Sequence, residues 1–364
     1  MRKFIKDKLS IIIPTFNEGE NIIKLIDGII HEIKNYEFEI IVVDDGSEDK
    51  TVDNIFSNYK NNNTIKVIQR EHDRGLVQSI KFALQSITGE YFIIMDGDGQ
   101  HSPKDIHLLV DDLKQNDLVI GCRDLVNLTA ISKQRALLSK FFNSLVGIIL
   151  SKKLTDPLTG FFAGNISILN KKFFLLSNSG FKILLDLIFS NKNSDIRISE
   201  KTINFNSRDS GNSKLGSQVV FSFVTQIISY IFNGLLSSKF IGFLIIGAFG
   251  FLIHFSILFL SLNFLQQSFY YSHVIATLIT ATFNFILNNY LNFYNSNIKS
   301  SKSLLLALLK YYLINLPGFL TSIGGASFVY NTMTKNPYFS SFAGVILETI
   351  FKYFISKTWI WKSK

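Results

Sequence analysis

The sequence predicts two domains of different fold class: an N-terminal α/β domain with a mainly parallel sheet, and a C-terminal all-α domain of four membrane-spanning helices. In the first 210 residues, short apolar runs alternate with amphipathic stretches. From Phe240 to Ile298, 59 residues contain no Asp, Glu, Lys or Arg, which far exceeds the ~20 residues that one helix needs to cross a bilayer. We expect the α/β domain over residues 1–214, interfacial helices over 215–238 and the membrane domain over 239–364.

Five short apolar runs predict the strands of the N-terminal domain. Amphipathic stretches, such as residues 20–34 and 76–87, lie between them and predict helices. Alternation of strands and helices is typical of a mainly parallel sheet. The predicted strands are residues 9–13, 38–43, 65–69, 91–95 and 117–121.

The segment LGSQVVFSFVTQIISYIFNGL, residues 215–235, is apolar, contains scattered Ser and Gln, and carries no charge. We expect one or two helices here that lie in the membrane interface and join the α/β domain to the first span. A buried core helix is the alternative interpretation.

Hydropathy predicts four membrane spans. A polar stretch, residues 263–271, divides the uncharged region into two, and two further apolar stretches follow it. An even number of spans leaves both chain ends on one side of the membrane. Residues 283–293 align with residues 351–361, aromatic on aromatic and polar on polar, which indicates a repeated helix pair. The spans are expected near residues 240–262, 272–294, 305–330 and 339–358.

The positive charge of the chain belongs to its apolar third. The net charge is +9, and after Leu236 nine lysines accompany a single acidic residue, Glu348. This pattern favours a membrane over nucleic acid as the partner. Lysines gather between spans two and three and at the C-terminus, so the positive-inside rule predicts that the N-terminal domain and both termini are cytoplasmic. We expect no signal peptide, and the single cysteine, Cys122, excludes an intrachain disulfide.

Three polar clusters follow predicted strands, where the ligand sites of α/β sheets lie. They are PTFNE at residues 14–18, DDGS at 44–47 and DGDGQH at 96–101. In the third cluster, Asp96, Asp98 and Gln100 supply oxygen ligands of the kind that Mg²⁺ or Mn²⁺ prefers. An Asp/Gly turn that closes a strand is the alternative. We interpret the neighbouring His101 as a loop-packing residue.

Two more clusters each allow two interpretations. Asp44 and Asp45 either hold a ribose or base, or form a turn in which Ser47 caps the next helix. Residues 208–214 either clamp phosphates near the bilayer or neutralise lipid head groups.

Ionisable residues within the predicted spans have simple structural roles in our interpretation. We expect His254 and His273 to form interhelical hydrogen bonds rather than a proton relay. Glu348 and Lys352 are four residues apart and are expected to pair on one helix face.

Seven motifs in order resemble the family-2 glycosyltransferases, and most closely their polyprenyl-phosphate sugar synthase branch, typified by dolichol-phosphate mannose synthase. They are PTFNE, VVDDGS, DGDGQHSP, GCRD, DPLTGFFAGN, GFKILLDL and RDSGNSKL, and they cover roughly residues 8–216. The segment from KFIGFLIIGAFGFLIHF onward is similar to the GtrA-type four-helix domain that is fused to some members. The resemblance implies a GT-A fold, a Rossmann-like nucleotide-diphospho-sugar transferase domain, tethered to the cytoplasmic face of the cell membrane.

The resemblance also implies roles for individual residues, each matched to a family motif. Asp96 and Asp98 match the D-x-D element, and Gln100 matches the accompanying metal ligand. The implied nucleotide-sugar contacts are Pro14, Phe16, Glu18, Val43, Asp45, Asp96, Gly97 and Arg208. The implied acceptor-phosphate contacts are Arg123, Arg135, Ser139 and Lys214. Asp98, Arg123 and Arg135 are the implied catalytic residues, and Asp156 opens the D-P-x-(S/T)-G-F motif.

Three positions depart from the family pattern. Phe16 stands where tyrosine is usual, which loses a hydroxyl and keeps the ring. Cys122 replaces the usual serine of G-S-R, and Phe162 occupies a position where arginine is common, so a phosphate contact from that position is absent. None of these changes removes a metal ligand, and we expect an active enzyme.

The implied reaction is inverting transfer of a single hexose, with mannose from GDP-mannose favoured, to dolichyl or polyprenyl phosphate. The acceptor phosphate is already anionic near neutral pH, so it needs no general base, unlike a sugar hydroxyl. Mg²⁺ or Mn²⁺ would neutralise the diphosphate leaving group as a Lewis acid. Two arginines would hold the acceptor phosphate and reduce its repulsion from the donor.

Several alternatives remain at this level. UDP-glucose is the other donor considered, and a processive polysaccharide synthase is disfavoured because tryptophan occurs only at positions 359 and 361, outside any Q-x-x-R-W element. The membrane domain either flips lipid-linked sugar or only anchors and orients the catalytic domain, with homo-oligomer contacts as a further role. Anchoring is the simpler interpretation.

Overall fold

A computed structural model describes residues 5–19, 21–71, 74–123, 147, 154–176, 182–204, 217–294, 297–298 and 300–345 of the 364-residue chain. Contacts between Cα atoms divide the chain into two compact units. The first comprises residues 1–214 with 226–235, and the second comprises residues 215–225 with 236–364.

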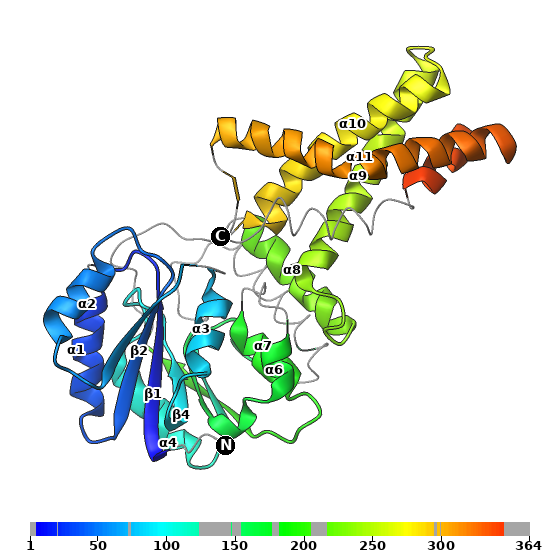
Figure 1. Ribbon diagram of the computed structural model, residues 1–364. Coiled ribbons are helices and arrows are strands. Elements are labelled where there is room, and N and C mark those ends of the chain that lie inside the picture. The colour runs from blue at the N-terminus through cyan, green and yellow to red at the C-terminus, as the bar shows by residue number, and fades with distance from the viewer. Residues whose placement is uncertain are drawn as a thin grey trace. The chain divides into compact units, whose positions relative to one another are not determined.

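Among the described residues, seven strands of the first unit form one sheet in the order β3-β2-β1-β4-β6-β5-β7 (Figure 1). Only the short strand β6 runs antiparallel to its neighbours β4 and β5, so the prediction of a mainly parallel sheet is confirmed. All five predicted strands are present. The strands are β1 (Ile5–Thr15), β2 (Phe38–Asp44), β3 (Ile65–Gln69), β4 (Gly89–Ile94), β5 (Leu118–Arg123), β6 (Phe162–Asn165) and β7 (Ile198–Ile203).

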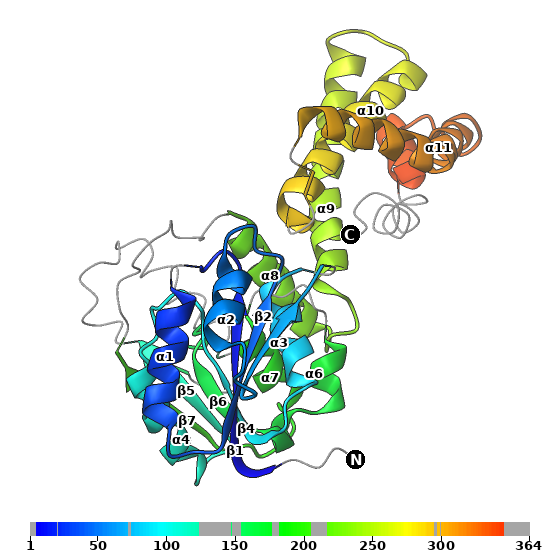
Figure 2. The same cartoon turned by 60° about the vertical axis from the view of Figure 1, so that its left-hand side comes forward.

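Helices cover both faces of this sheet, because strands β1 and β2 are apolar on both faces. Buried residues of α1 (Ile22–Ile33) and α4 (Ile106–Leu113) pack with alternate residues of β1, β2 and β4 into one core. Helix α3 (Leu76–Leu84) lies on the opposite face, as Figures 1 and 2 show. The remaining helices of this part are α2 (Thr51–Tyr59), η1 (Pro103–Asp105), η2 (Ile166–Ile168), α6 (Lys171–Leu175) and α7 (Ile183–Ser190).

The predicted helical cap at Ser47 is wrong. Helix α2 begins only at Thr51, and its N-cap residue, Lys50, makes no side-chain capping bond. Ser47 instead belongs to the turn after β2, where its backbone N–H donates to Asp44.

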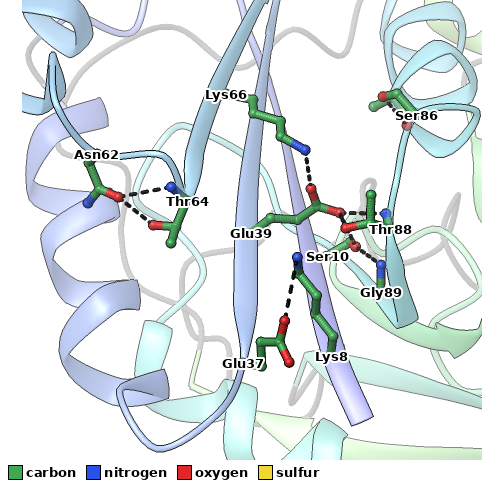
Figure 3. Close-up of polar contacts among 11 residues, drawn as sticks. Lys8, Ser10, Glu37, Glu39, Asn62, Thr64, Lys66, Ser86, Thr88 and Gly89 are labelled. Atoms are coloured by element: carbon green, nitrogen blue, oxygen red, sulfur yellow. Dashed lines mark hydrogen bonds and ion pairs between the residues drawn. The ribbon is translucent and has the colours of Figure 1, made fainter. Parts of the chain in front are cut away.

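A buried carboxylate joins the parallel strands near their amino-terminal ends (Figure 3). Glu39 of β2 accepts hydrogen bonds from Ser10 Oγ of β1 at 2.7 Å and from Thr88 before β4 at 2.6 Å (N–H) and 2.8 Å (Oγ1). Lys66 Nζ of β3 lies 2.6 Å from the other carboxylate oxygen. Burial by itself would raise the pKa of Glu39, but these hydrogen bonds outweigh it and lower the pKa from 4.5 to about 2.

We therefore predict that Glu39 stabilises the fold in a pH-dependent way. Its folded-state pKa lies below the unfolded value, so its contribution is fully present above about pH 4.5 and is lost as the pH falls toward 2. Glu39→Gln should lower the unfolding midpoint of the full chain in detergent at pH 7, and the difference from wild type should shrink between pH 4.5 and pH 2. Glu37→Gln, at a carboxylate that is 60% exposed, is the control. An equal difference at every pH would contradict the prediction.

A second buried network connects four helices of the first unit. Lys81 Nζ of α3 lies 3.2 Å from Asp186 Oδ2 of α7, and it also donates to the carbonyl oxygen of Leu176 at 3.2 Å. The other carboxylate oxygen, Asp186 Oδ1, accepts from Gln226 Nε2 at 3.0 Å and from the Tyr230 hydroxyl at 2.6 Å. Both belong to α8 (Ser217–Ile231), so the last turns of this helix are held on the α/β domain.

Removal of one partner of this ion pair should be strongly destabilising, because Lys81 and Asp186 are only 5% and 2% exposed. We expect Asp186→Ala to cost about 3–5 kcal/mol of unfolding free energy, since it leaves a buried ammonium without its counter-ion. Chemical denaturation of the full chain in detergent would measure this. Asp111→Ala, which breaks the exposed pair with Lys114, should leave the unfolding midpoint unchanged, and equal effects of the two variants would refute the assignment.

The second unit contains three described helices that are long and apolar enough to span a membrane. They are α9 (Ser238–Asn263), α10 (Phe269–Leu287) and α11 (Ser301–Thr332), and α10 continues into one π-helical turn, Asn288–Asn292. These helices coincide with the first three predicted spans. Residues 337–345 are helical and begin the fourth. The rest of that span, the second half of the predicted repeat, and the Glu348–Lys352 pair lie outside the described residues.

The two histidines of the membrane unit form interhelical hydrogen bonds, as predicted. Nε2 of His254 on α9 lies 2.7 Å from Ser341 Oγ, and Nδ1 of His273 on α10 lies 2.8 Å from the same atom. One hydroxyl thus bridges α9, α10 and the helical segment 337–345.

Candidate active site at the carboxyl edge of the sheet

The parallel pairing of β1, β2 and β4 brings the three predicted clusters to one edge of the sheet. In the register of these strands Thr15 pairs with Asp44, and Ile12 pairs with Ile94. The loops after these strands, which begin at residues 16, 45 and 95, therefore leave the sheet side by side. Pro14 is the next-to-last residue of β1.

Hydrogen bonds fix the loop after β1 against the loop after β2. Asn17, in the left-handed region at φ 58°, donates its N–H to Ser47 Oγ at 2.8 Å, and its side chain accepts from the N–H of Glu48 at 2.9 Å. The Glu18 N–H donates to Thr51 Oγ1 at 2.9 Å. Phe16 lies on this fixed loop and is 45% exposed, so its ring is available to stack on a planar ligand.

The adjacent carboxylates Asp44 and Asp45 are both buried and have separate protein partners. Asp44 accepts from Thr15 Oγ1 at 3.1 Å and from the N–H groups of Gly46 and Ser47 at 3.0 and 2.8 Å. This is the turn-forming role that the sequence left as one alternative.

Asp45 is bound by three groups from the next loop and helix. Arg70 Nη1 lies 2.9 Å away, Ser79 Oγ 2.6 Å and the Gly75 N–H 2.6 Å. This carboxylate therefore connects β2 to the start of α3. Val43, another predicted contact, is completely buried in β2, so its side chain supports the strand.

The D-x-D cluster follows β4 directly. The Asp98 side chain is buried and accepts the N–H of Gln100 at 3.1 Å, whereas the Asp96 side chain is 36% exposed. A Cβ at Gly160 would lie 2.3 Å from Asp96 Oδ2, so only glycine at position 160 leaves room for this carboxylate. A Cβ at Gly97 would lie 3.1 Å from the Thr15 side chain, so the cluster also packs closely on the end of β1.

His101 supports this cluster from inside the fold. Its ring stacks on Phe161 at a centroid distance of 5.2 Å, and its Nδ1 accepts the Asp96 N–H at 3.3 Å. Burial lowers the pKa of His101, although the carboxylates of Asp96 and Asp98 oppose that shift. A neutral, packed histidine agrees with the expectation that His101 belongs to the loop packing.

The chemistry of this donor set fits a hard divalent cation. Asp96, Asp98 and Gln100 offer carboxylate and amide oxygens, the ligands that suit Mg²⁺ or Mn²⁺. Within the described part of the chain, no three His, Cys, Asp or Glu side chains group closely enough to hold a metal. A cation bound by Asp96, Asp98 and Gln100 would keep coordination positions for phosphate oxygens or water.

An arginine and an aspartate form a bidentate ion pair beside this cluster. Arg123, at the end of β5, places Nε 2.7 Å from Asp156 Oδ2 and Nη2 2.9 Å from Asp156 Oδ1. Asp156 is almost completely buried, so it fixes the plane of the guanidinium group. Asp96 also interacts electrostatically with Arg123 and adds to the rise of its pKa. The role of Asp156 as the positioning partner of Arg123 was not anticipated from its motif.

Lys182 is a further charged residue of this site that the sequence did not single out. Burial lowers the pKa of its ammonium group, and the carboxylates of Asp96 and Asp156 oppose that shift. It lies in the GFKILLDL motif immediately before α7. Its position in that motif was the only signal that pointed to it.

The remaining predicted site residues and departures fall into two groups. Arg135, Ser139, Arg208 and Lys214 lie outside the described residues. Phe162 is buried in β6 and packs edge to face on Phe92, which agrees with the absence of a phosphate contact from this position. Cys122 is also buried, with its thiol 3.2 Å from Glu200 Oε1, and burial together with this carboxylate raises its pKa.

Comparisons with known proteins find two regions of the chain that match family models. Residues 10–175 match the family described as Glycosyl transferase family 2, and residues 242–361 match the GtrA/DPMS transmembrane domain.

Two curated relatives are both named dolichol-phosphate mannosyltransferase. The protein of Pyrococcus furiosus is 32% identical over 228 residues, which cover 60% of this chain and 62% of that protein. The protein of Mycosarcoma maydis is 29% identical over 231 residues, which cover 60% of this chain and 77% of that protein. The match thus spans less than two thirds of the length of the Pyrococcus protein.

Among solved structures, the chain is similar to glucosyl-3-phosphoglycerate synthase from Mycobacterium tuberculosis in complex with Mn²⁺, UDP-glucose and phosphoglyceric acid. The TM-score is 0.48 at 18% sequence identity, and the alignment covers 61% of this chain and 80% of that one.

Proposed function

We propose that the chain transfers one hexose from a nucleotide sugar to a polyprenyl or dolichyl phosphate. The proposal is supported by the match of residues 10–175 to Glycosyl transferase family 2 and of residues 242–361 to the GtrA/DPMS transmembrane domain. The names of its relatives favour mannose as the sugar. GDP-mannose is then the proposed donor, and the cytoplasmic face of the membrane is the proposed place of reaction.

The observation that carries this proposal is the juxtaposition of the D-x-D cluster with the Arg123–Asp156 ion pair. The carboxylates of Asp96 and Asp98 attract a cation, and the guanidinium of Arg123 attracts an anion. A metal at the first position would neutralise the diphosphate of the donor as a Lewis acid. Arg123, held in a fixed plane by Asp156, would bind a second phosphate beside it.

A phosphate acceptor needs no general base. An anionic phosphate oxygen attacks without first losing a proton, so Asp96 and Asp98 act through the metal rather than as proton shuttles. Arg123 and Lys182 reduce the repulsion between the acceptor and the donor diphosphate. The phosphate oxygen forms a bond to the anomeric carbon as the bond to the diphosphate breaks, and in-line displacement inverts that carbon.

The proposal is tested by radiolabel transfer with the purified full chain in detergent, Mn²⁺ or Mg²⁺ and a short polyprenyl phosphate. GDP-mannose and UDP-glucose are offered in parallel reactions. We expect one of the two donors to give radiolabel in the lipid phase, and we expect EDTA to abolish this transfer. Asp98→Ala should abolish transfer, whereas Asp111→Ala, at an exposed carboxylate on α4, should retain it. Full activity of purified Asp98→Ala would refute the metal-site assignment. Transfer of label from UDP-glucose but not from GDP-mannose would show that the transferred sugar is glucose instead of mannose.

A second candidate activity is movement of the lipid-linked sugar by the membrane domain. It is favoured by an open pocket of about 540 Å³ that is lined by α9, α10, Tyr311 of α11 and the helical segment 337–345. No Asp, Glu, Lys or Arg lines this pocket among the described residues, and Thr280 Oγ1 and Asn284 Oδ1 are buried there without a hydrogen-bond partner. Liposomes that contain the chain and preformed mannosyl-phosphate lipid in one leaflet would show its transfer to the other leaflet. A rate equal to that of protein-free liposomes would leave anchoring as the role of this domain.

A further inference from the structure

Exposed apolar side chains of the α/β unit lie at the end of α6 and at the end of α8, two segments that contact each other. Leu175, the last residue of α6, is 73% exposed. Ile231, Phe232 and Leu235, at the end of α8 and in the following turn, are 63%, 49% and 88% exposed. Leu176 contacts this turn, because a Cβ at Gly234 would lie 2.8 Å from Leu176 Cδ2. We call Leu175, Ile231, Phe232 and Leu235 the apolar face.

The buried ion pair of Lys81 and Asp186 holds the two parts of this face together. Lys81 donates to the carbonyl oxygen of Leu176, and its Nζ lies 5.0 Å from the centroid of the Phe173 ring in α6. Its counter-ion Asp186 accepts from Gln226 and Tyr230 of α8. The end of α6 and the end of α8 are therefore fixed to the same pair of charges.

Chain continuity places this face next to the bilayer. Leu235 is only three residues before Ser238, where the first membrane-spanning helix begins. Three peptide units span at most about 11 Å. A bilayer has a headgroup layer of about 5–8 Å on each side of its hydrocarbon core. With Ser238 at the edge of the hydrocarbon core, residues that contact the 231–235 turn would lie at the depth of the headgroups or immediately above them.

The polar residues beside the face suit a lipid surface. Lys171 and Lys172 are exposed at the start of α6, four and three residues before Leu175. Nζ of Lys172 lies 4.5 Å from the centroid of the Phe189 ring, and that ring stacks on Tyr230. Basic side chains next to exposed apolar ones bind anionic headgroups while the apolar groups enter the interface.

We propose that α6 is a second membrane-docking element of the catalytic unit, in addition to the segment that leads into the first span. Leu175 enters the interfacial layer together with Phe232 and Leu235, and Lys171 and Lys172 bind anionic lipid headgroups. The catalytic unit is then held at two points of its surface rather than by a single linker, which fixes its tilt on the bilayer. This inference is independent of the reaction that the chain catalyses.

Site-specific fluorescence tests this in the full chain. Cys122 is the only cysteine of the sequence, so Cys122→Ser gives a background without thiols. Leu175→Cys and Phe232→Cys are each labelled with an environment-sensitive fluorophore and placed in phospholipid nanodiscs. Phe56→Cys on α2 and Leu108→Cys on α4 are matched controls, because these apolar residues are also exposed, at 52% and 45%.

We expect the labels at positions 175 and 232 to show blue-shifted emission and a loss of emission when the lipids carry a spin label on their acyl chains. The labels at positions 56 and 108 should show neither change and should be quenched by aqueous iodide. A label at position 175 that behaves like the controls would overturn the proposal. A blue shift there without lipid quenching would overturn it as well, because it would indicate contact with protein instead.

The role of the lysines is tested in the same format. Lys171→Glu combined with Lys172→Glu should reduce the lipid quenching at position 175 in nanodiscs with anionic lipid and leave it unchanged in zwitterionic ones. Equal quenching at position 175 with and without the two Lys→Glu substitutions, in anionic nanodiscs, would overturn the assignment of headgroup binding to these lysines. The label at position 232 provides the internal reference, since its distance from the first span is set by the chain itself.

Discussion

Parallel pairing of β1, β2, β3 and β4 is the constraint on which the candidate site depends. The carboxyl ends of parallel strands lie at one edge of the sheet, so the loops after β1, β2 and β4 are close together there. At the opposite end of the strands, Glu39 receives hydrogen bonds from Ser10, Thr88 and Lys66. This buried carboxylate thus adds side-chain hydrogen bonds to the backbone pairing that sets the strand register.

Acidic groups in this chain serve three physically different purposes. Glu39 and Asp186 are buried and paired, so they hold the sheet and the helices together. Asp44, Asp45 and Asp156 orient other groups, namely a turn, the start of α3 and the guanidinium of Arg123. Asp96 is partly exposed and Asp98 lies beside it, which suits them to a metal. Exposure and partners, not residue type, distinguish these roles.

The buried carboxylate of Asp186 connects α3 and α7 to the end of α8 within the first unit. Asp186 binds Lys81 on one side and the end of α8 on the other, a few residues before the first span begins. Changes at this ion pair would therefore reach both the packing of α6 and the position of the membrane-proximal turn.

The sequence by itself determined the fold class, all five of the strands it predicted and three long apolar helices, and it predicted the carboxylates of the D-x-D cluster as a metal site. These depend on local periodicity and on residues close together in the chain, which a single sequence records. It misassigned Ser47 and gave Asp156 and Lys182 no role. Only the tertiary structure brought Asp156 to Arg123, 33 positions apart, because contacts between distant segments depend on packing and have no local pattern. The position of α6 beside the turn after α8 also depends on contacts between distant segments, namely those of the buried Lys81–Asp186 pair with Leu176 and with α8.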